Sequence, residues 1–285
     1  MTKHTPVPPT PRRVVVAVAP NGGRKTKVDH PALPSSADEL ARTAAECLER
    51  GASMIHLHLR DRDGGPVLDA EAYRLVMARI CQTVGDRIVL QITSEAMGRY
   101  TPAQQRSVIL QTNPEAVSLA LRELAPDEAD EKDFGLFLGK LKQMSIWPQF
   151  ILYTPEATKR FASMQHRGLI PFETPAVLFV LGRFSLLRTA TPADLLPFIA
   201  PDVPRFSFWS VCAFGRREAA CVTAAALFGG HARVGFENNL MLPTGEQASS
   251  NADLVAAATR ALKAVGMATE NADGLREEII AAAMR

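Results

Sequence analysis

Two histidines in the segment IHLHLRDRDG, residues 55–64, are the clearest candidates for chemistry in this sequence. His56 and His58 are two of only 6 histidines in 285 residues, and they alternate with aliphatic residues, as in a buried strand. Side chains two positions apart on a strand share a face, so both imidazoles should converge on one point, where they could bind a divalent metal. The alternative interpretation is a pair of core histidines satisfied by neighbouring carbonyl groups.

A carboxylate that could complete such a site is Glu237, in the segment GFENN at residues 235–239. It follows a second short apolar run, ARVGF. Two histidines and one glutamate would make a facial set of three ligands with open positions for substrate. This arrangement requires a fold that brings the ends of two distant strands together.

The pattern of apolar runs predicts such a fold. Eight short, continuous apolar segments are expected to be strands, and each is followed by a turn signal or a helical pattern. These segments are VVVAVA (14–19), SMIHLH (53–58), RIVLQIT (87–93), AVSLA (116–120), IWPQFILY (146–153), AVLFVLG (176–182), RFSFWSV (205–211) and ARVGF (232–236).

Helices are expected between these strands. Ser36 and Glu39 have capping-box spacing at the start of the first helix, and Pro102 occupies a favoured first-turn position of another. The predicted helical ranges are 36–50, 69–83, 101–112, 132–144, 155–168, 191–199 and 214–229, then one helix from about 250 and a last amphipathic segment from about 270.

This alternation, without a change of composition that would mark a second domain, favours an α/β fold: a single-domain (β/α)8 TIM barrel over residues 13–285 after a flexible lead, 1–12. In a closed barrel the first strand lies between the second and the eighth. The ends that carry His58 and Glu237 are then about two strand spacings of ~4.8 Å apart, at the catalytic mouth.

Composition points to small-molecule chemistry. The 32 basic and 30 acidic residues leave a formal net charge of +2 without long runs of one sign, which gives no reason to expect nucleic acid or a membrane surface as a partner. The four cysteines have no CxxC spacing, and no apolar run is long enough to span a bilayer. These features predict a cytoplasmic enzyme.

The motifs together resemble those of the β-keto acid cleavage enzyme family. The resemblance covers nearly the whole chain: APNGG and HPALP in the first loop, GASMIHLHLRD at strand two, QITSEA at strand three, and RVGFENN followed by SSNADLV near the end. It implies a zinc-containing barrel, usually a homotetramer, that exchanges acyl groups between a β-keto acid and acetyl-CoA to give acetoacetate and a new acyl-CoA. The family's metal ligands fall on His56, His58 and Glu237.

The resemblance also suggests which polar groups act on the substrate. Thr93 and Ser94 at strand three, Ser118 in strand four and Arg233 in strand eight match polar or basic positions of the family. Their expected role is to stabilise the charge that develops on cleavage. In the first loop, Asn21 and Arg24 are predicted to bind substrate, and Arg24 with Lys25 could anchor an acidic substrate or the phosphates of coenzyme A.

One position departs from the family pattern. The metal-binding glutamate is followed there by an aspartate that takes part in the reaction, whereas this chain has Asn238, which is predicted to bind substrate instead. An amide cannot accept a proton in this range. Glu95 is the nearest replacement, and Glu123 lies farther along the next loop.

Three other functions stay open on the sequence. A metal-dependent hydrolase with a His-x-His barrel would draw histidines from later strands, but His166 lies in a helical stretch and His231 at the opposite end of the barrel. A metal-dependent acyl-CoA lyase or aldolase-type barrel would need an acidic metal motif after strand one, where PNGG stands. A non-catalytic barrel that binds a metal or an acyl ligand is compatible with Asn238.

Overall fold

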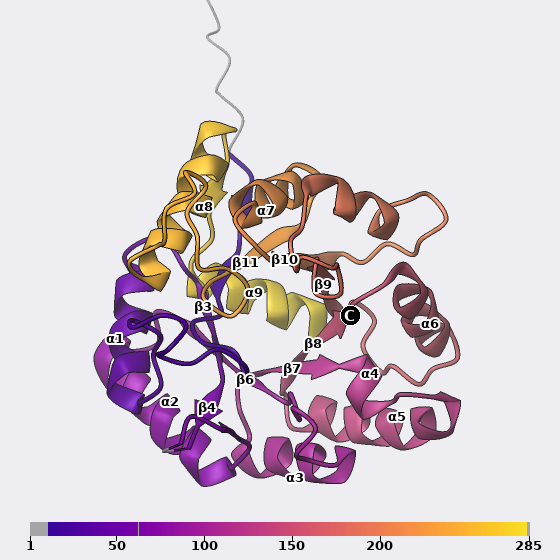
Figure 1. Cartoon of the computed structure of the whole chain (residues 1–285). Coiled ribbons are helices and arrows are strands. Elements are labelled where there is room, and N and C mark those ends of the chain that lie inside the picture. Colours follow the sequence, from indigo (N-terminus) through magenta and orange to yellow (C-terminus); the bar gives the residue numbers. More distant parts are fainter. Residues whose placement is uncertain (1–10, 62, 284–285) are drawn as a thin grey trace, which may run out of the picture.

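The computed structural model describes residues 11–61 and 63–283, and its centre is a closed barrel of parallel strands (Figure 1). Around the barrel the strands follow the order β10-β11-β2-β3-β6-β7-β8-β9. They are β2 (Val16–Val18), β3 (Met54–Leu57), β6 (Val89–Thr93), β7 (Ala116–Ala120), β8 (Trp147–Leu152), β9 (Ala176–Leu181), β10 (Phe208–Ala213) and β11 (His231–Val234). The eight predicted strands and the single-domain barrel are confirmed.

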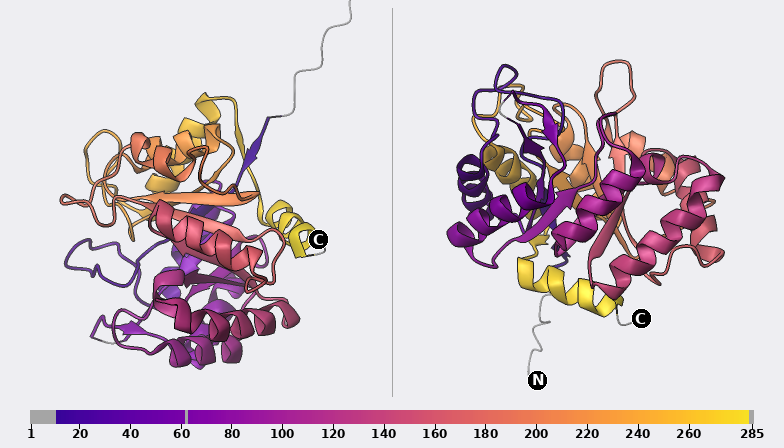
Figure 2. Two further views of the ribbon diagram at one scale, coloured as in Figure 1. Left: turned by 90° about the vertical axis from the view of Figure 1, so that its right-hand side faces the viewer. Right: turned by 90° about the horizontal axis from the view of Figure 1, so that it is seen from below.

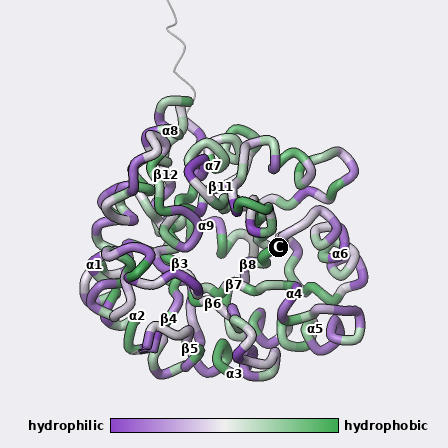
Figure 3. Tube along the Cα trace, viewed as in Figure 1, coloured by the Kyte–Doolittle hydropathy of each residue, from purple (hydrophilic) through white to green (hydrophobic). Residues whose placement is uncertain are grey.

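Helices surround the barrel, and along them hydrophobic and hydrophilic residues alternate, as expected when one face is buried (Figure 3). They are α1 (Ala37–Leu48), α2 (Ala70–Val84), α3 (Pro102–Thr112), α4 (Leu121–Leu124), α5 (Glu128–Gln143), α6 (Pro155–His166), α7 (Glu218–Leu227), α8 (Asn251–Ala264), α9 (Ala272–Ala283) and the 3-10 helix η1 (Pro192–Phe198). Ser36 and Glu39 form the expected capping box at the start of α1. No described helix is long and apolar enough to cross a membrane.

The inside of the barrel is filled in layers. At the amino-terminal end of the strands, Met54, Val89, Trp147 and Phe208 belong to one apolar cluster with residues of α9. This helix lies across the bottom of the barrel (Figure 2). The middle layer holds polar side chains hydrogen-bonded to one another, and the carboxyl-terminal layer carries the predicted site residues.

Two short strand pairs lie outside the barrel and were not predicted. β1 (Arg13–Val14) pairs with β12 (Ala268–Thr269), and β4 (Leu59–Arg60) forms an antiparallel pair with β5 (Pro66–Val67). Pairs of two residues have too few positions to show an alternating pattern.

Two details adjust the predicted elements. Most of the predicted lead, residues 1–10, lies outside the described residues, while Arg12 donates hydrogen bonds to the carbonyl oxygens of Ala226, Gly229 and Gly230. Pro148 is tolerated in β8 because this strand pairs with β9 only from Gln149 onward, so no hydrogen bond to β9 is lost at the proline.

Candidate active site

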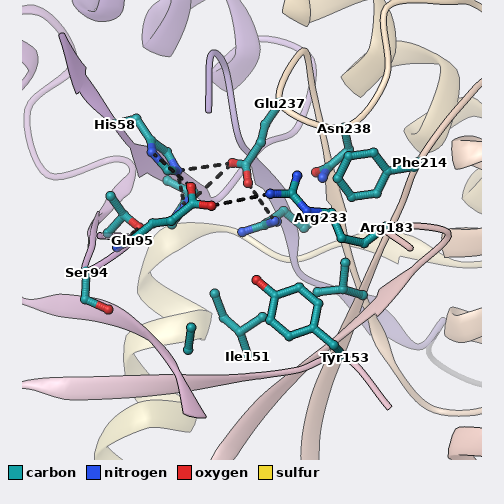
Figure 4. Close-up of a pocket in the computed structure, with 14 residues that line it drawn as sticks. His58, Ser94, Glu95, Ile151, Tyr153, Arg183, Phe214, Arg233, Glu237 and Asn238 are labelled. Carbon is teal, nitrogen blue, oxygen red and sulfur yellow. Dashed lines mark hydrogen bonds and ion pairs between the residues drawn. The ribbon is translucent and has the colours of Figure 1, made fainter. Parts of the chain in front are cut away.

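His56, His58 and Glu237 meet at the carboxyl-terminal mouth of the barrel. The Nε2 atoms of the two histidines are 3.2 Å apart, and Glu237 Oε2 lies 3.7 Å from that of His56 and 3.5 Å from that of His58. Both histidines are buried. The geometry therefore brings together the three side chains that the sequence predicts as ligands. Figure 4 shows His58 and Glu237 facing each other.

The spacing of these atoms fits a divalent metal such as zinc. Ligands about 2.0–2.1 Å from a tetrahedral ion lie roughly 3.3 Å from one another. Glu237 Oε2 is buried and has no hydrogen-bond partner, which is costly unless a cation or a donor is bound there. The donor set of two imidazoles and one carboxylate is of the kind that catalytic zinc prefers.

A chain of side-chain hydrogen bonds orients His56 from inside the barrel. Gln91 Nε2 donates to Gln149 Oε1 (3.2 Å), and Gln149 Nε2 donates to Ser210 Oγ (3.3 Å). Gln91 Oε1 is then left to accept from His56 Nδ1, 2.8 Å away. With its proton on Nδ1, the ring presents an unprotonated Nε2 to the site. Burial, followed by the charge of Arg233, lowers the pKa of His56 to about 3.

Arg233 is the cation beside this site. One of its terminal nitrogens donates to Glu237 Oε1 (3.2 Å) and to Cys212 Sγ (3.3 Å), while its Nε and other terminal nitrogen are buried without a partner. Burial alone would raise the pKa of Glu237, but Arg233 and the two histidines hold it well below its usual range. Glu237 is thus a carboxylate, and Arg233 keeps free donors for an anion in the pocket.

The two candidate proton carriers lie in different places. Glu95 lines the pocket, with Oε2 3.8 Å from His58 Nδ1 and Oε1 3.5 Å from Arg183. The carboxylate of Glu123 instead accepts hydrogen bonds from the backbone N–H of Ala96 and from Gln105, both at 2.9 Å. Of the two, only Glu95 faces the three candidate metal ligands.

The first loop is tied over the site by several hydrogen bonds. Lys25 Nζ donates to the carbonyl oxygen of Glu237 (2.7 Å), and Arg60 donates to the carbonyl oxygens of Gly22, Gly23 and Lys25. Burial lowers the pKa of Lys25. Gly22 has a φ of +63°, and a Cβ atom there would lie 2.5 Å from Cγ of Glu237. A glycine is therefore needed where this loop passes the glutamate.

The three hydroxyl groups predicted to act on the substrate differ in whether they can donate a hydrogen bond into the pocket. Thr93 lines the pocket and accepts a hydrogen bond from the N–H of Glu95 (3.0 Å), so its own proton is free to be donated. Ser94 also lines the pocket, but its hydroxyl donates to the carbonyl oxygen of Ser118 (2.8 Å). Ser118 Oγ is buried without a partner and lies below the pocket lining.

Of the three residues predicted to bind substrate, one lines the pocket and two do not. Asn238 lines the pocket, and both polar atoms of its amide are buried without partners. Asn21 is buried and donates to the carbonyl oxygens of Pro34 (2.9 Å) and His58 (3.0 Å), so it connects the first loop to the end of β3. Arg24 is exposed and is not part of the pocket lining.

Sequence reasoning missed several residues of the site. Arg183, after β9, pairs with Glu95 and lies 5.3 Å from the ring centroid of Phe214. Tyr153 and Phe214 close the pocket on the side away from the metal ligands (Figure 4). Arg183 lies in a loop whose sequence has no recognisable motif, so no local pattern indicated it. Arg60 belongs to the HLHLRD motif, and its place there could have indicated a role near the site.

Comparisons with known proteins identify a family and related folds. The profile of the beta-keto acid cleavage enzyme family matches residues 13–279. A 3-keto-5-aminohexanoate cleavage enzyme of Fusobacterium nucleatum is 29% identical over 269 residues, which covers 93% of this chain and 97% of the relative. A 3-oxoadipate:acetyl-CoA acetyltransferase of Cupriavidus necator is 26% identical and covers 85% of each chain.

Solved structures support the fold. The binary complex of ObcA with oxaloacetate has a TM-score of 0.68 at 15% identity, over 87% of this chain and 67% of that one. A type I 3-dehydroquinate dehydratase from Clostridium difficile has a TM-score of 0.53 at 9% identity and covers 95% and 91%.

Proposed function

Because the chain belongs to the beta-keto acid cleavage enzyme family, we propose that it exchanges acyl groups between a β-keto acid and acetyl-CoA. The products are acetoacetate and a new acyl-CoA. The observation that carries the proposal is the meeting of His56, His58 and Glu237 beside the free donors of Arg233. A β-keto acid carries an anionic carboxylate and a ketone oxygen, the kinds of group that a cation and these donors bind.

We assign the cofactor role to zinc or a similar divalent ion held by His56, His58 and Glu237. When bound, the ion would act as a Lewis acid toward the ketone and the carboxylate of the substrate. Arg233 Nη1 and Nε are available to hold a carboxylate or a developing negative charge. The Thr93 hydroxyl and the Asn238 amide offer further hydrogen bonds to substrate oxygens. Ser94 and Ser118 stay predictions as catalytic donors, and Asn21 and Arg24 stay predictions as substrate contacts.

Glu95 is the proposed proton carrier. The exchange requires a proton to leave C2 of the β-keto acid, so that C2 can bond to the acetyl carbon while the thioester bond of acetyl-CoA breaks. The thiolate of coenzyme A then takes the acyl group as the C2–C3 bond of the original keto acid breaks, and the proton returns to C2 of acetoacetate. Glu95 is the pocket carboxylate that is not part of the ligand set.

The decisive experiment follows labelled carbon. Purified protein is incubated with acetyl-labelled acetyl-CoA and a β-keto acid, and both products are measured. Label in C3 and C4 of acetoacetate, together with an equal amount of new acyl-CoA, is expected. Release of free coenzyme A without acetoacetate would indicate a thioesterase or hydrolase, and metal binding without turnover of any β-keto acid would indicate a binding barrel.

Metal content tests the ligand assignment separately. We expect about one zinc or similar ion per chain in the unmodified protein and its loss in the His56→Ala, His58→Ala double variant. His166→Ala is the control, since His166 is an exposed histidine at the end of α6. Full metal content in a folded double variant would refute the site.

We propose that the protein forms a homodimer or homotetramer and that it acts in the cytoplasm. The oligomer is supported by exposed apolar side chains after β9, where Leu186 and Leu187 are 104% and 83% exposed. Sedimentation velocity would measure the state; a monomer at micromolar concentration would contradict it.

A further inference from the structure

The pocket has two chemically different halves. Metal ligands, Arg233 and Glu95 lie over the barrel segment formed by β11, β2, β3 and β6. The opposite segment, β7 to β10, contributes Ala120, Ile151, Val180 and Phe214, which we call the apolar wall. These four residues are buried and belong to one apolar cluster with Leu178 and Cys212, and Tyr153 packs against it.

The strands hold this wall in place. Ala120 of β7 is in register with Ile151 of β8, and Val180 of β9 with Cys212 of β10. Phe214 follows β10, where its N–H donates to the carbonyl oxygen of Leu181 (3.0 Å). Side chains on paired strand ends cannot move apart without breaking the barrel, so the wall is a preformed surface.

Among the described residues, the apolar wall carries no charge of its own. The two carboxylates that line the pocket, Glu95 and Glu237, lie on the other half. Arg183 reaches the pocket beside Phe214, but its charge is compensated by Glu95, 3.5 Å away. A charged group placed against the wall would lose its hydration without gaining a partner.

From this division we propose that the wall binds the substituent on the keto carbon of the substrate, and that this substituent is a short, uncharged aliphatic chain. The inference rests on the proposed function, because it places the ketone and carboxylate at the polar half. Tyr153 and Phe214 line the same pocket and limit the room beside the wall, so an ethyl or propyl group should fit better than a long acyl chain.

A panel of four β-keto acids tests the proposal. The probes are 3-oxopentanoate, 3-oxohexanoate, 3-oxoadipate and 3-keto-5-aminohexanoate, each with acetyl-CoA. The last three share a six-carbon backbone and carry an uncharged, an anionic and a cationic substituent. We expect kcat/KM for 3-oxohexanoate to exceed that for both charged substrates by about 100-fold or more, since each buried charge would be unpaired.

The outcomes separate the inference from the function on which it rests. Preference for 3-oxoadipate would show that Arg183 binds a second carboxylate and would overturn the apolar assignment while leaving the acyl exchange intact. Preference for 3-keto-5-aminohexanoate would likewise overturn the apolar assignment. If no β-keto acid of the panel is exchanged, the proposed function itself fails.

Two variants of the wall should shift chain-length preference in opposite directions. Ala120→Leu fills the pocket and should lower the kcat/KM ratio of 3-oxohexanoate to 3-oxopentanoate by about 10-fold, while Val180→Ala enlarges it and should raise the ratio about 4-fold. Ala103→Leu is the control, because it makes the same alanine-to-leucine substitution at an exposed position of α3 and should leave the ratio unchanged. Unchanged ratios in both folded wall variants would refute contact between the wall and the substituent.

Discussion

At the scale of single residues, the polar side chains near the pocket differ in whether their polar atoms already have hydrogen-bond partners. Glu123 is half-buried near the mouth, and its carboxylate already accepts hydrogen bonds from Ala96 and Gln105. Arg233 and Asn238 keep buried atoms without partners. Because an unsatisfied buried polar group is costly, such atoms indicate where a ligand supplies the missing interaction.

Glu95 is expected to be the group that moves the proton. Glu95→Gln keeps the shape of the side chain but removes its basicity, so turnover should fall roughly 100- to 10,000-fold with metal content preserved. Asn238→Ala should reduce turnover much less, because it removes hydrogen bonds only. Single-turnover rates and metal analysis on both variants measure the difference. Near-normal turnover in Glu95→Gln would assign the proton to Glu123, water or the substrate.

At the scale of elements, two sets of contacts hold the candidate metal ligands in place. One is the hydrogen-bonded chain of Gln91, Gln149 and Ser210, which runs across the inside of the barrel from β6 through β8 to β10. The other is the first loop, which Arg60 and Lys25 fasten beside Glu237. Both act on the ligands without being ligands themselves.

Gln91→Leu should weaken metal binding about 10- to 100-fold, because His56 loses the acceptor that fixes its proton on Nδ1. Ser210→Ala, at the far end of the same chain, should cost about 1 kcal/mol of stability with little effect on the metal. Competition with a chelator gives the metal affinity, and thermal unfolding gives stability. Equal metal affinities in Gln91→Leu and the unmodified protein would show that His56 is held by the strand alone.

Gly22→Ala should lower metal affinity as well as stability. Gly22 and Gly85 both have a positive φ, +63° and +66°, so alanine is strained at both positions and should lower the stability of both variants. Only at Gly22 does the added methyl group also meet Glu237; at Gly85 nothing lies within 4 Å. We therefore expect Gly85→Ala to lower the melting temperature alone. If both variants bind metal normally, Glu237 adjusts to the methyl group at little cost.

At the scale of the whole molecule, stability and chemistry are concentrated at opposite ends of the barrel. The amino-terminal end is closed by α9, whose Leu275 is fully buried among barrel residues. The carboxyl-terminal end carries the buried charges. Substitutions at the closed end should therefore affect folding without affecting the reaction.

Leu275→Ala should destabilise the protein by about 2–5 kcal/mol through loss of burial and the cavity that it leaves. Ile280→Ala, on the same helix but 58% exposed, should change stability by less than about 0.5 kcal/mol. Denaturant unfolding measures both, and kcat/KM below the unfolding transition should be unaltered in both. A large loss of activity in folded Leu275→Ala would mean that the two ends are coupled.

The sequence alone determined the barrel and the grouping of His56, His58 and Glu237, for reasons of strand geometry and strand order. Continuous apolar runs specify strands buried on both faces, and the two-residue period of a strand puts His56 and His58 on one side. Closure of the barrel then brings in Glu237. Residues whose positions follow from the two-residue period of a strand and from the order of strands in the barrel can be predicted from sequence.

The tertiary structure decided what depends on the partners of each side chain. The sequence left Glu95 and Glu123 as alternatives, and the hydrogen bonds of Glu123 separate them. It gave no sign of Arg183 or of the apolar wall, because wall residues from four strands look like any other core residues in sequence. Which side chains face one another across the pocket is set by strand register and loop path, and neither is recorded in local sequence patterns.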